Sequence, residues 1–279
     1  MIGVKLEGRL GNQLFQYAFI CAAAKKLNTR FYLDRSIIPF LLPQYFNVEA
    51  GIIDRIFSIR GFRSFFDLHL RIAFYKRLGN LFYKSCIRFN ENEQPNSQLV
   101  ALRDNVLYLG FFQSEYYFEN AKADIISAFR LKQKYKQAFD KALTEARIPG
   151  NYVAIHIRRG DYIDHKWALD FAYYHKALKA VAHKASFFVF VSDEPDLIEK
   201  EFNYLPNKYI SRNSEIIDFQ FLSNAKACIL SNSSFSWWGA YLNANNPHII
   251  APKYWLGFNE KVERPCQVIS KKFTTIEVD

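Results

Sequence analysis

Residues 152–162 read YVAIHIRRGDY, an apolar run that changes abruptly into charged residues. The apolar part, 152–157, predicts a buried β-strand, and the polar residues mark its carboxyl end. Similar apolar runs alternate downstream with segments of helix length. We predict further strands at 187–191, near 209, at 228–230 and at 248–250, and helices at 171–183, 195–204, 215–226 and 236–243. Strands that alternate with helices indicate a parallel sheet covered on both faces, so the predicted fold class is α/β.

The charged residues after the first of these strands form the first candidate site. Open parallel sheets bind ligands at the carboxyl ends of their strands, and His156, Arg158, Arg159 and Asp161 lie at such an end. An arginine presents a planar fork of donors that suits a diphosphate, and it can stabilise a nucleotide leaving group without a metal ion. The alternative is a structural ion pair that caps the strand.

Two further polar blocks follow strands in the same half of the chain. Residues 231–240 read SNSSFSWWGA and open a predicted helix, whose N-terminus can bind an anion. The alternative is an ordinary helix cap with tryptophans in the core. Residues 192–194 read SDE and offer carboxylates for a ribose or a base N–H edge, or else they cap the next helix. Because these blocks all fall at strand ends, we expect them to share one crevice.

The first part of the chain also begins as an α/β fold. Residues 3–6, 7–13 and 14–27 read as strand, turn and helix, and 30–33 adds a second strand. The glycines of the turn are spaced G-x-x-G and do not meet the dinucleotide-binding fingerprint. Farther along we predict helices at 65–82 and 121–146 and a strand at 106–111. The pair Pro149-Gly150 precedes the strand at 152–157, so we predict two domains, 1–147 and 148–279.

The net charge of +10 implies an anionic partner, which can be a nucleotide diphosphate, a nucleic acid or a membrane surface. The basic residues do not cluster with an RNP, KH or zinc-finger pattern, so we expect no nucleic-acid partner. The basic stretch 55–88 is a candidate for peripheral contact with lipid head groups at the inner face of a bacterial membrane. The alternative for this stretch is a solvated helix face.

The compartment and the metal content are also predicted from simple patterns. The N-terminus lacks the pattern of a secretory signal, and the longest apolar run, 14–24, is too short to span a bilayer, so we expect a cytoplasmic protein. The four cysteines contain no C-x-x-C pair, which argues against a zinc site and against a disulfide framework.

Three blocks of the sequence resemble one known family. They are GRLGNQLFQYA at 8–18, HIRRGDY at 156–162 and NSSFSWWGA at 232–240. In this order they resemble the α-1,2-fucosyltransferases of glycosyltransferase family eleven, particularly the bacterial ones. The resemblance implies a GT-B-like pair of Rossmann-type domains facing a central cleft, with the acceptor on the side of 1–147 and GDP-fucose bound by 148–279. It further implies inverting transfer of L-fucose, with no cofactor, to the 2-hydroxyl of a terminal galactoside in a bacterial surface glycan.

The resemblance also implies roles for single residues. Arg158 is expected to grip the β-phosphate and stabilise the departing GDP. The expected donor-binding residues are Asn12, His156, Arg158, Asp193, Ser233, Ser234 and Phe235. Asp161 is the first candidate for a general base, unless it orients Arg158 or Arg159, and the further candidates are Asp164, His165 and Asp170. Three other readings stay open: a transferase for another nucleotide sugar, a non-catalytic glycan-binding relative, and a basic nucleic-acid-binding protein.

Overall fold

The computed structural model describes residues 1–48, 73, 75–77, 79, 81, 83–181, 183–184 and 186–278. The chain divides into two compact units, one formed by Met1–Leu131 with Pro265–Val268 and the other by Lys132–Arg264 with Ile269–Asp279. Most of the helix expected at 65–82 and most of the basic stretch 55–88 fall outside the described residues, but residues 73, 75–77, 79 and 81 are described and are helical. Among the helices that are described, none combines the length and the hydropathy needed to cross a bilayer.

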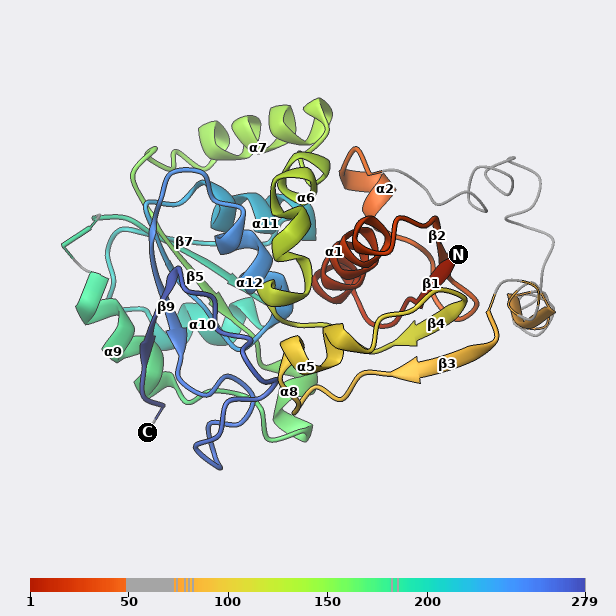
Figure 1. Ribbon diagram of the computed structural model, residues 1–279. Helices are drawn as coiled ribbons and strands as arrows, with labels where there is room; N and C mark the ends of the chain where they lie inside the picture. Colours follow the sequence, from red (N-terminus) through yellow and green to blue (C-terminus); the bar gives the residue numbers. More distant parts are fainter. Residues whose placement is uncertain are drawn as a thin grey trace. The chain divides into compact units, whose positions relative to one another are not determined.

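The first unit contains a four-stranded parallel sheet in the order β2-β1-β4-β3 (Figure 1). Its helix α1 is buried over most of its surface because its sequence is apolar on nearly every side, as expected for a helix covered by protein all round. The ring of Phe19 in this helix stacks on Phe112 with 3.8 Å between centroids. The elements of the unit are β1 (Ile2–Lys5), α1 (Leu10–Lys26), β2 (Phe31–Asp34), α2 (Leu42–Tyr45), β3 (Ser85–Arg88), α5 (Pro95–Val100), β4 (Val106–Leu109), the 3₁₀ helix η1 (Glu115–Ala121) and α6 (Lys122–Ala128).

The second unit contains a six-stranded parallel sheet in the order β10-β9-β8-β5-β6-β7. Counted within the unit, this order is 6-5-4-1-2-3, the doubly wound order of dinucleotide-binding sheets, so the strand order reverses between β5 and β8. The elements are α7 (Gln133–Glu145), β5 (Val153–Ile157), α8 (Gly160–Asp164), α9 (Phe171–Val181), β6 (Phe188–Ser192), α10 (Pro195–Glu201), β7 (Lys208–Ile210), α11 (Glu215–Asn224), β8 (Ala227–Ile229), α12 (Ser234–Tyr241), β9 (His248–Pro252) and β10 (Phe273–Ile276).

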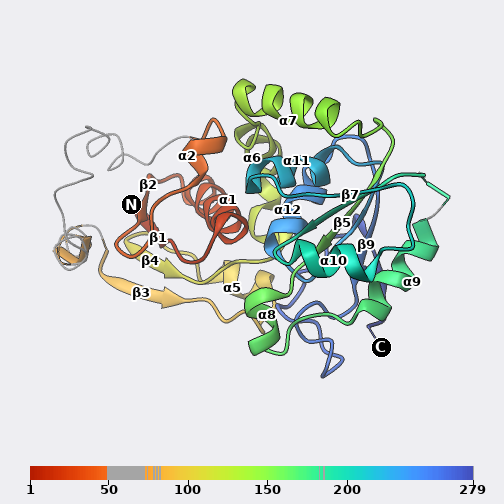
Figure 2. The same ribbon diagram turned by 180° about the vertical axis from the view of Figure 1, so that it is seen from behind.

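Side chains of β5 alternate between two apolar layers, because successive residues of a strand point to opposite faces of the sheet. Val153, Ile155 and Ile157 belong to a core that includes residues of α9 and α10. On the opposite face, the ring of Tyr152, just before β5, packs on Phe221 of α11. Figures 1 and 2 show α9 with α10, and α11 with α12, as the helices that flank this sheet. All five residues of β5 are buried, as expected for a central strand of a parallel sheet.

The domain boundary lies earlier than the sequence indicated. The chain divides between Leu131 and Lys132 instead of between 147 and 148, because α7 packs against the second unit. The ring of Phe139 in α7 lies 5.2 Å from Phe221 of α11, and the Nε2 of Gln220 donates to the backbone oxygen of Tyr135. The prediction of a single helix at 121–146 was therefore wrong. This segment forms two helices, α6 and α7, and the boundary between the two units lies between them.

Candidate functional site

The candidate site begins where β5 and β8 end side by side. His156 lies on the face of β5 that looks toward α11 and α12, and its Nδ1 lies 2.7 Å from the hydroxyl of Ser231, which follows β8 by two residues. The imidazole also lies 5.4 Å from the ring of Phe235 in α12. This hydrogen bond therefore joins two of the polar blocks at the point where the strand order reverses, which is where doubly wound sheets bind their ligands.

The imidazole of His156 is neutral at physiological pH. The side chain is 6% exposed, and this burial, reinforced by the positive charge of Arg158, lowers its pKa to about 3. One ring nitrogen of a neutral imidazole donates and the other accepts. His156 therefore contributes a fixed hydrogen-bonding group to the site and no charge.

Arg158 is held between two carboxylates. Its guanidinium lies 2.5 Å from the Oδ1 of Asp161 and 3.0 Å from the Oδ2 of Asp193, and it sits over the ring of Tyr162 at 5.6 Å. The side chain is 19% exposed, so the cation is oriented and still reaches solvent. A guanidinium has five N–H donors, and these two contacts leave it with further donors for an anionic ligand.

The loop that carries Arg158 is fixed by Asp193 at the end of β6. The backbone N–H of Arg159 donates to the Oδ1 of Asp193 at 3.0 Å. A Cβ added to Gly160 would lie 2.6 Å from the Oδ2 of Asp193, so only glycine allows the carboxylate to approach the loop this closely. The guanidinium of Arg159 pairs with Glu194 at 3.3 Å and covers the ring of Phe171 at 4.8 Å.

The block after β8 forms the N-terminus of α12. Ser233 is the N-cap of this helix, and its hydroxyl accepts from the N–H of Phe235 at 3.4 Å. The Nδ2 of Asn232 donates to the backbone oxygen of Trp167 at 2.9 Å. The capping role and the burial of the two tryptophans of this helix are thus both present in the structure. The first turn of a helix also offers backbone N–H groups and a partial positive charge to an anion, so a cap and an anion site can coexist here.

Comparison with models of known protein families shows to which family the chain belongs. The model described as glycosyl transferase family 11 matches residues 1–265. The chain belongs to this family. Among its relatives is an α-1,2-colitosyltransferase of Escherichia coli, 32% identical over 91% of this chain and 92% of the relative. A galactoside 2-α-L-fucosyltransferase of Bos taurus is 24% identical over 86% of this chain and 63% of the relative.

The fold of this family 11 chain matches that of solved fucosyltransferases. The NodZ α-1,6-fucosyltransferase soaked with GDP-fucose has a TM-score of 0.52 and 15% sequence identity, over 86% of this chain and 91% of NodZ. The predicted α/β, GT-B-like fold with two Rossmann-type units is therefore confirmed, and so is the predicted family. The roles of the individual site residues stay predictions at this level of identity.

The structure brings most of the predicted residues to one edge of the second sheet. His156, Arg158, Asp161, Asp193 and the block 231–235 are connected there by the contacts above. Asn12 belongs to the first unit, where it lies on α1 and its Oδ1 accepts from the Nε2 of Gln113 at 2.9 Å. Gly8 has a φ of +75°, and a Cβ at this position would lie 2.3 Å from the Nδ2 of Asn12. The G-x-x-G turn thus shapes the surroundings of Asn12, and it does so in the unit that lacks the Arg158 loop.

The other candidates for a general base are not among the groups that hold Arg158. Asp164, His165 and Asp170 are exposed. Asp170 accepts from the N–H of Ala172 at the start of α9, and both His165 and Asp170 line a separate pocket described below. In the described ranges, no three His, Cys, Asp or Glu side chains lie close enough together to hold a metal ion. Metal independence remains a prediction.

Two residues at this edge were not singled out from the sequence. Tyr162 lies beneath Arg158, and its hydroxyl donates to the backbone oxygen of Asn232 at 3.4 Å, so it links the two loops. Asp218 lies on α11, accepts from the hydroxyl of Ser211 at 2.5 Å, and has its pKa raised to about 7 by burial. The available signal for Asp218 was a lone carboxylate inside the apolar run EIIDFQFL at 215–222.

Proposed function

We propose that this chain transfers L-fucose from GDP-fucose to the 2-hydroxyl of a terminal galactoside in a bacterial surface glycan, with inversion and without a metal ion. The observation that carries the proposal is the hydrogen bond between His156 and Ser231. It joins the Arg158 loop and the N-terminus of α12 at one edge of the sheet, where a diphosphate finds an oriented cation and a helix terminus together.

The proposed reaction is a direct displacement. An acceptor oxygen forms a bond to C1 of fucose on one face while the bond from C1 to the β-phosphate oxygen breaks on the other, and GDP leaves with the bonding pair. Arg158 and the first turn of α12 stabilise the charge that develops on the departing phosphate. Because Asp161 and Asp193 already hold the guanidinium in place, little reorganisation is needed at the moment of reaction.

Asp161 is the proposed general base, and its contact with Arg158 suggests a second role as a positioning residue. Its side chain is 50% exposed, so an acceptor hydroxyl has access to it. The variant Asp161→Asn keeps an oxygen for Arg158 and removes the base. If Asp161 takes the proton, kcat falls steeply in Asp161→Asn; if it only orients Arg158, Asp161→Asn keeps most of the activity, because the amide oxygen still accepts from Arg158.

The contacts expected with guanine and with the ribose, from His156 and Asp193, are supported to different degrees. His156 is buried, neutral and near Phe235, which suits a hydrogen bond to one edge of guanine. Both oxygens of Asp193 are occupied by Arg158 and by the N–H of Arg159. We therefore propose that Asp193 acts mainly by positioning Arg158. For Ser233, Ser234 and Phe235 we keep the proposed role of a phosphate-binding turn.

The name of the E. coli relative specifies colitose and so suggests GDP-colitose as a second candidate donor for this chain. Colitose is L-fucose without its 3-hydroxyl, so the same phosphate-binding edge serves both sugars. A site that hydrogen-bonds the 3-hydroxyl would strongly prefer fucose, because the sugar without it leaves a buried partner unpaired. Comparing kcat/KM for GDP-fucose and GDP-colitose in one assay decides between the two donors.

The test of the proposed function is the release of GDP from GDP-fucose by the purified protein with lactose or N-acetyllactosamine, with and without EDTA. We expect turnover that survives chelation and a product whose NMR spectrum shows fucose on O2 of galactose. Turnover that EDTA abolishes would overturn the metal-free mechanism. Failure to bind or consume either GDP-sugar would overturn the proposed reaction.

A further inference from the structure

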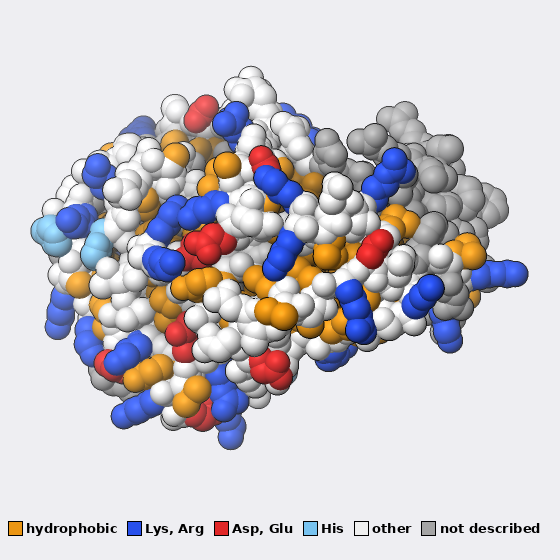
Figure 3. All heavy atoms as spheres, in the orientation of Figure 1, with side chains coloured by type: hydrophobic (Ala, Val, Ile, Leu, Met, Phe, Trp, Pro, Cys, Tyr) orange, Lys and Arg blue, Asp and Glu red, His pale blue; other side chains and the backbone are white. Residues whose placement is uncertain are grey.

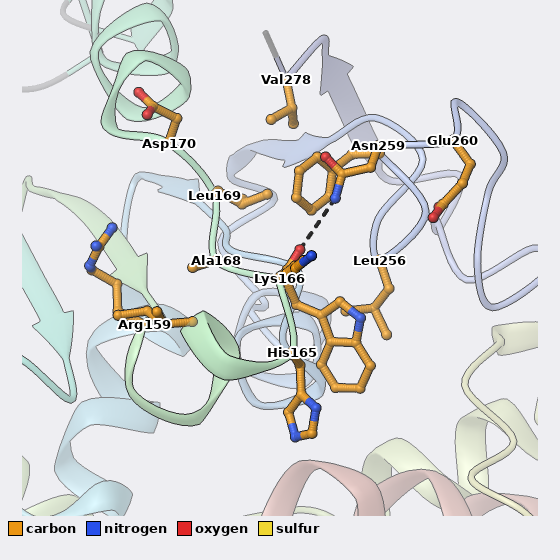
Figure 4. Close-up of a pocket in the computed structure, with 13 residues that line it drawn as sticks. Arg159, His165, Lys166, Ala168, Leu169, Asp170, Leu256, Asn259, Glu260 and Val278 are labelled. Atoms are coloured by element: carbon orange, nitrogen blue, oxygen red, sulfur yellow. Dashed lines mark hydrogen bonds between the residues drawn. The ribbon is translucent and has the colours of Figure 1, made fainter.

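A pocket of about 830 Å³ lies beside the Arg158 loop, entirely within the second unit. Figure 4 shows its two walls, one formed by the segment 163–170 and the other by the segment 256–260. Ligand sites in proteins commonly have volumes of roughly 300–1,000 Å³, so the pocket is large enough for a sugar ligand. None of the residues 231–235 lines it, and it is therefore distinct from the proposed phosphate site.

The backbone of both walls is unusual. Lys166 has a φ of +57° and turns the chain at the end of α8, so that the N–H of Trp167 bonds back to Tyr162 at 2.8 Å. On the other wall, a Cβ at Gly257 would lie 1.9 Å from the backbone oxygen of Val262, so glycine is required there. The Nδ2 of Asn259 donates to the oxygen of Lys166 at 3.3 Å and links the walls.

The lining combines an accessible aromatic surface with polar groups of balanced charge. The indole of Trp167 is 37% exposed and stacks against the ring of His165 at 4.6 Å. The two cations of the lining, Arg159 and Lys166, are matched by two carboxylates, those of Asp170 and Glu260. Arg159 is already paired with Glu194 outside the pocket. This lining suits a neutral ligand that has an apolar face and many hydroxyls.

Trp167 of the pocket contacts two residues of the candidate site, Tyr162 and Asn232. The ring of Tyr162 lies 5.6 Å from the Arg158 guanidinium and 5.7 Å from the ring of Trp167. Asn232, in the phosphate-turn block, bonds to the backbone oxygen of Trp167. A ligand against Trp167 would therefore be separated from the cation that is proposed to hold the leaving group by two aromatic rings, those of Trp167 and Tyr162.

We propose that this pocket binds the acceptor galactoside, with the C–H face of a sugar ring against Trp167 and sugar hydroxyls on Asn259 and Glu260. The assignment of the bound sugar as acceptor rests on the proposed function, but sugar binding itself does not. The resemblance implied an acceptor on the side of 1–147, whereas this proposal gives the second unit a role in acceptor recognition besides its proposed role in donor binding.

The first experiment measures sugar binding without any donor. Of the four tryptophans only Trp167 is exposed, since Trp237, Trp238 and Trp255 are at most 1% exposed. Methyl β-galactoside, lactose and N-acetyllactosamine should change the intrinsic fluorescence of the wild-type protein saturably. The change should vanish in Trp167→Phe and persist in Tyr204→Ala, a control that removes a 57% exposed ring from the same unit. No response to any of the three sugars overturns the proposal.

The second experiment separates acceptor binding from donor binding by steady-state kinetics. Trp167→Ala should raise the KM for lactose about tenfold, a factor that corresponds to about 1.4 kcal/mol, and leave the KM for GDP-fucose unchanged. Glu260→Gln changes an exposed side chain and should also raise the acceptor KM. Unchanged acceptor KM in both variants overturns the pocket assignment while the proposed function stands. Fluorescence-detected galactoside binding in a protein that transfers no sugar supports the pocket and overturns the proposed function.

Discussion

At the scale of single residues, the position of Arg158 depends on a glycine. Gly160 allows the carboxylate of Asp193 to reach both the guanidinium of Arg158 and the N–H of Arg159. The local sequence RRGDY therefore does two things: it supplies the cation and it opens the space for the carboxylate that orients it.

Gly160→Ala tests this arrangement. The new Cβ would displace Asp193 and with it Arg158, and a displacement of about 1 Å at a reacting group can cost on the order of 100-fold in rate. We expect a loss of that order in kcat/KM with a preserved fold. Gly150→Ala is the matched control, because nothing lies within 4 Å of its Cβ. Equal activity of the two variants would contradict the role given to Gly160.

His156 should make the second unit sensitive to acid. Its folded pKa of about 3 lies below the ordinary value of 6.5, so the unfolded state binds more protons and stability is lost as the pH falls from about 6.5 toward 3. The free energy of unfolding should fall by up to about 1.4 kcal/mol per pH unit in this window. His156→Gln keeps a hydrogen-bonding side chain and should remove this slope. Parallel pH profiles for the two proteins would contradict the buried, neutral imidazole.

Asp218 should act in the opposite direction. Its folded pKa of about 7 lies above the ordinary value of 3.8, so the folded state binds the extra proton. Its contribution to stability is present below about pH 4 and is lost as the pH rises toward 7 and beyond. Asp218→Asn, which stays neutral, should flatten the profile between pH 4 and 8. A variant that keeps the wild-type loss over this range would show that another group causes it.

At the scale of elements, the parallel strands of the second unit were predictable and the ends of the helical segments were not. The buried strands β5, β6, β8 and β9 are short apolar runs and were all predicted near their observed bounds. β10 was missed because its sequence, FTTI, pairs with only one neighbour and keeps two exposed threonines. The break between α6 and α7 was missed because local apolar content continues across it, and only packing shows that α7 belongs to the second unit.

Phe139 provides the test of where α7 belongs. Its side chain is 4% exposed and packs on Phe221, so Phe139→Ala should destabilise the second unit by about 3–5 kcal/mol. All four tryptophans lie in this unit, so urea unfolding followed by tryptophan fluorescence reports on it directly. Lys141→Ala, on the exposed side of α7, should change stability by less than about 0.5 kcal/mol. An unaffected transition in Phe139→Ala would place α7 outside the cooperative unit.

At the candidate site, too, some features could be predicted from the sequence, and others depend on tertiary packing. The strand ends predicted a shared crevice, and the His156–Ser231 hydrogen bond connects two of its blocks. Tyr162 and Trp167 were not predicted as parts of one cluster, because spacing along a loop does not reveal which rings will meet. Asp218 was missed because the sequence shows only one acidic residue inside an apolar helix. Its contact with Ser211 depends on the fold and cannot be read from the sequence.

At the scale of the whole molecule, the net charge of +10 can be compared with the positions of the basic residues that the structure describes. On the face shown in Figure 3, lysine and arginine side chains are spread among acidic, hydrophobic and uncharged ones. The charges nearest the candidate site are balanced or slightly negative, with Arg158 and Arg159 facing Asp161, Asp193 and Glu194. We therefore expect binding of the proposed donor to depend on the orientation of individual groups more than on the net charge of +10.

The most direct test of the central claim is the rate of GDP release from GDP-fucose in the presence of lactose by Arg158→Ala, Arg158→Lys and the surface control Arg212→Ala. Loss of one group that stabilises developing charge costs about 100- to 1,000-fold in kcat. We predict a loss of that size in Arg158→Ala, incomplete recovery in Arg158→Lys because a lysine lacks the planar fork, and wild-type rates in Arg212→Ala. Wild-type turnover by a folded Arg158→Ala protein would contradict the assignment of Arg158 to the leaving group.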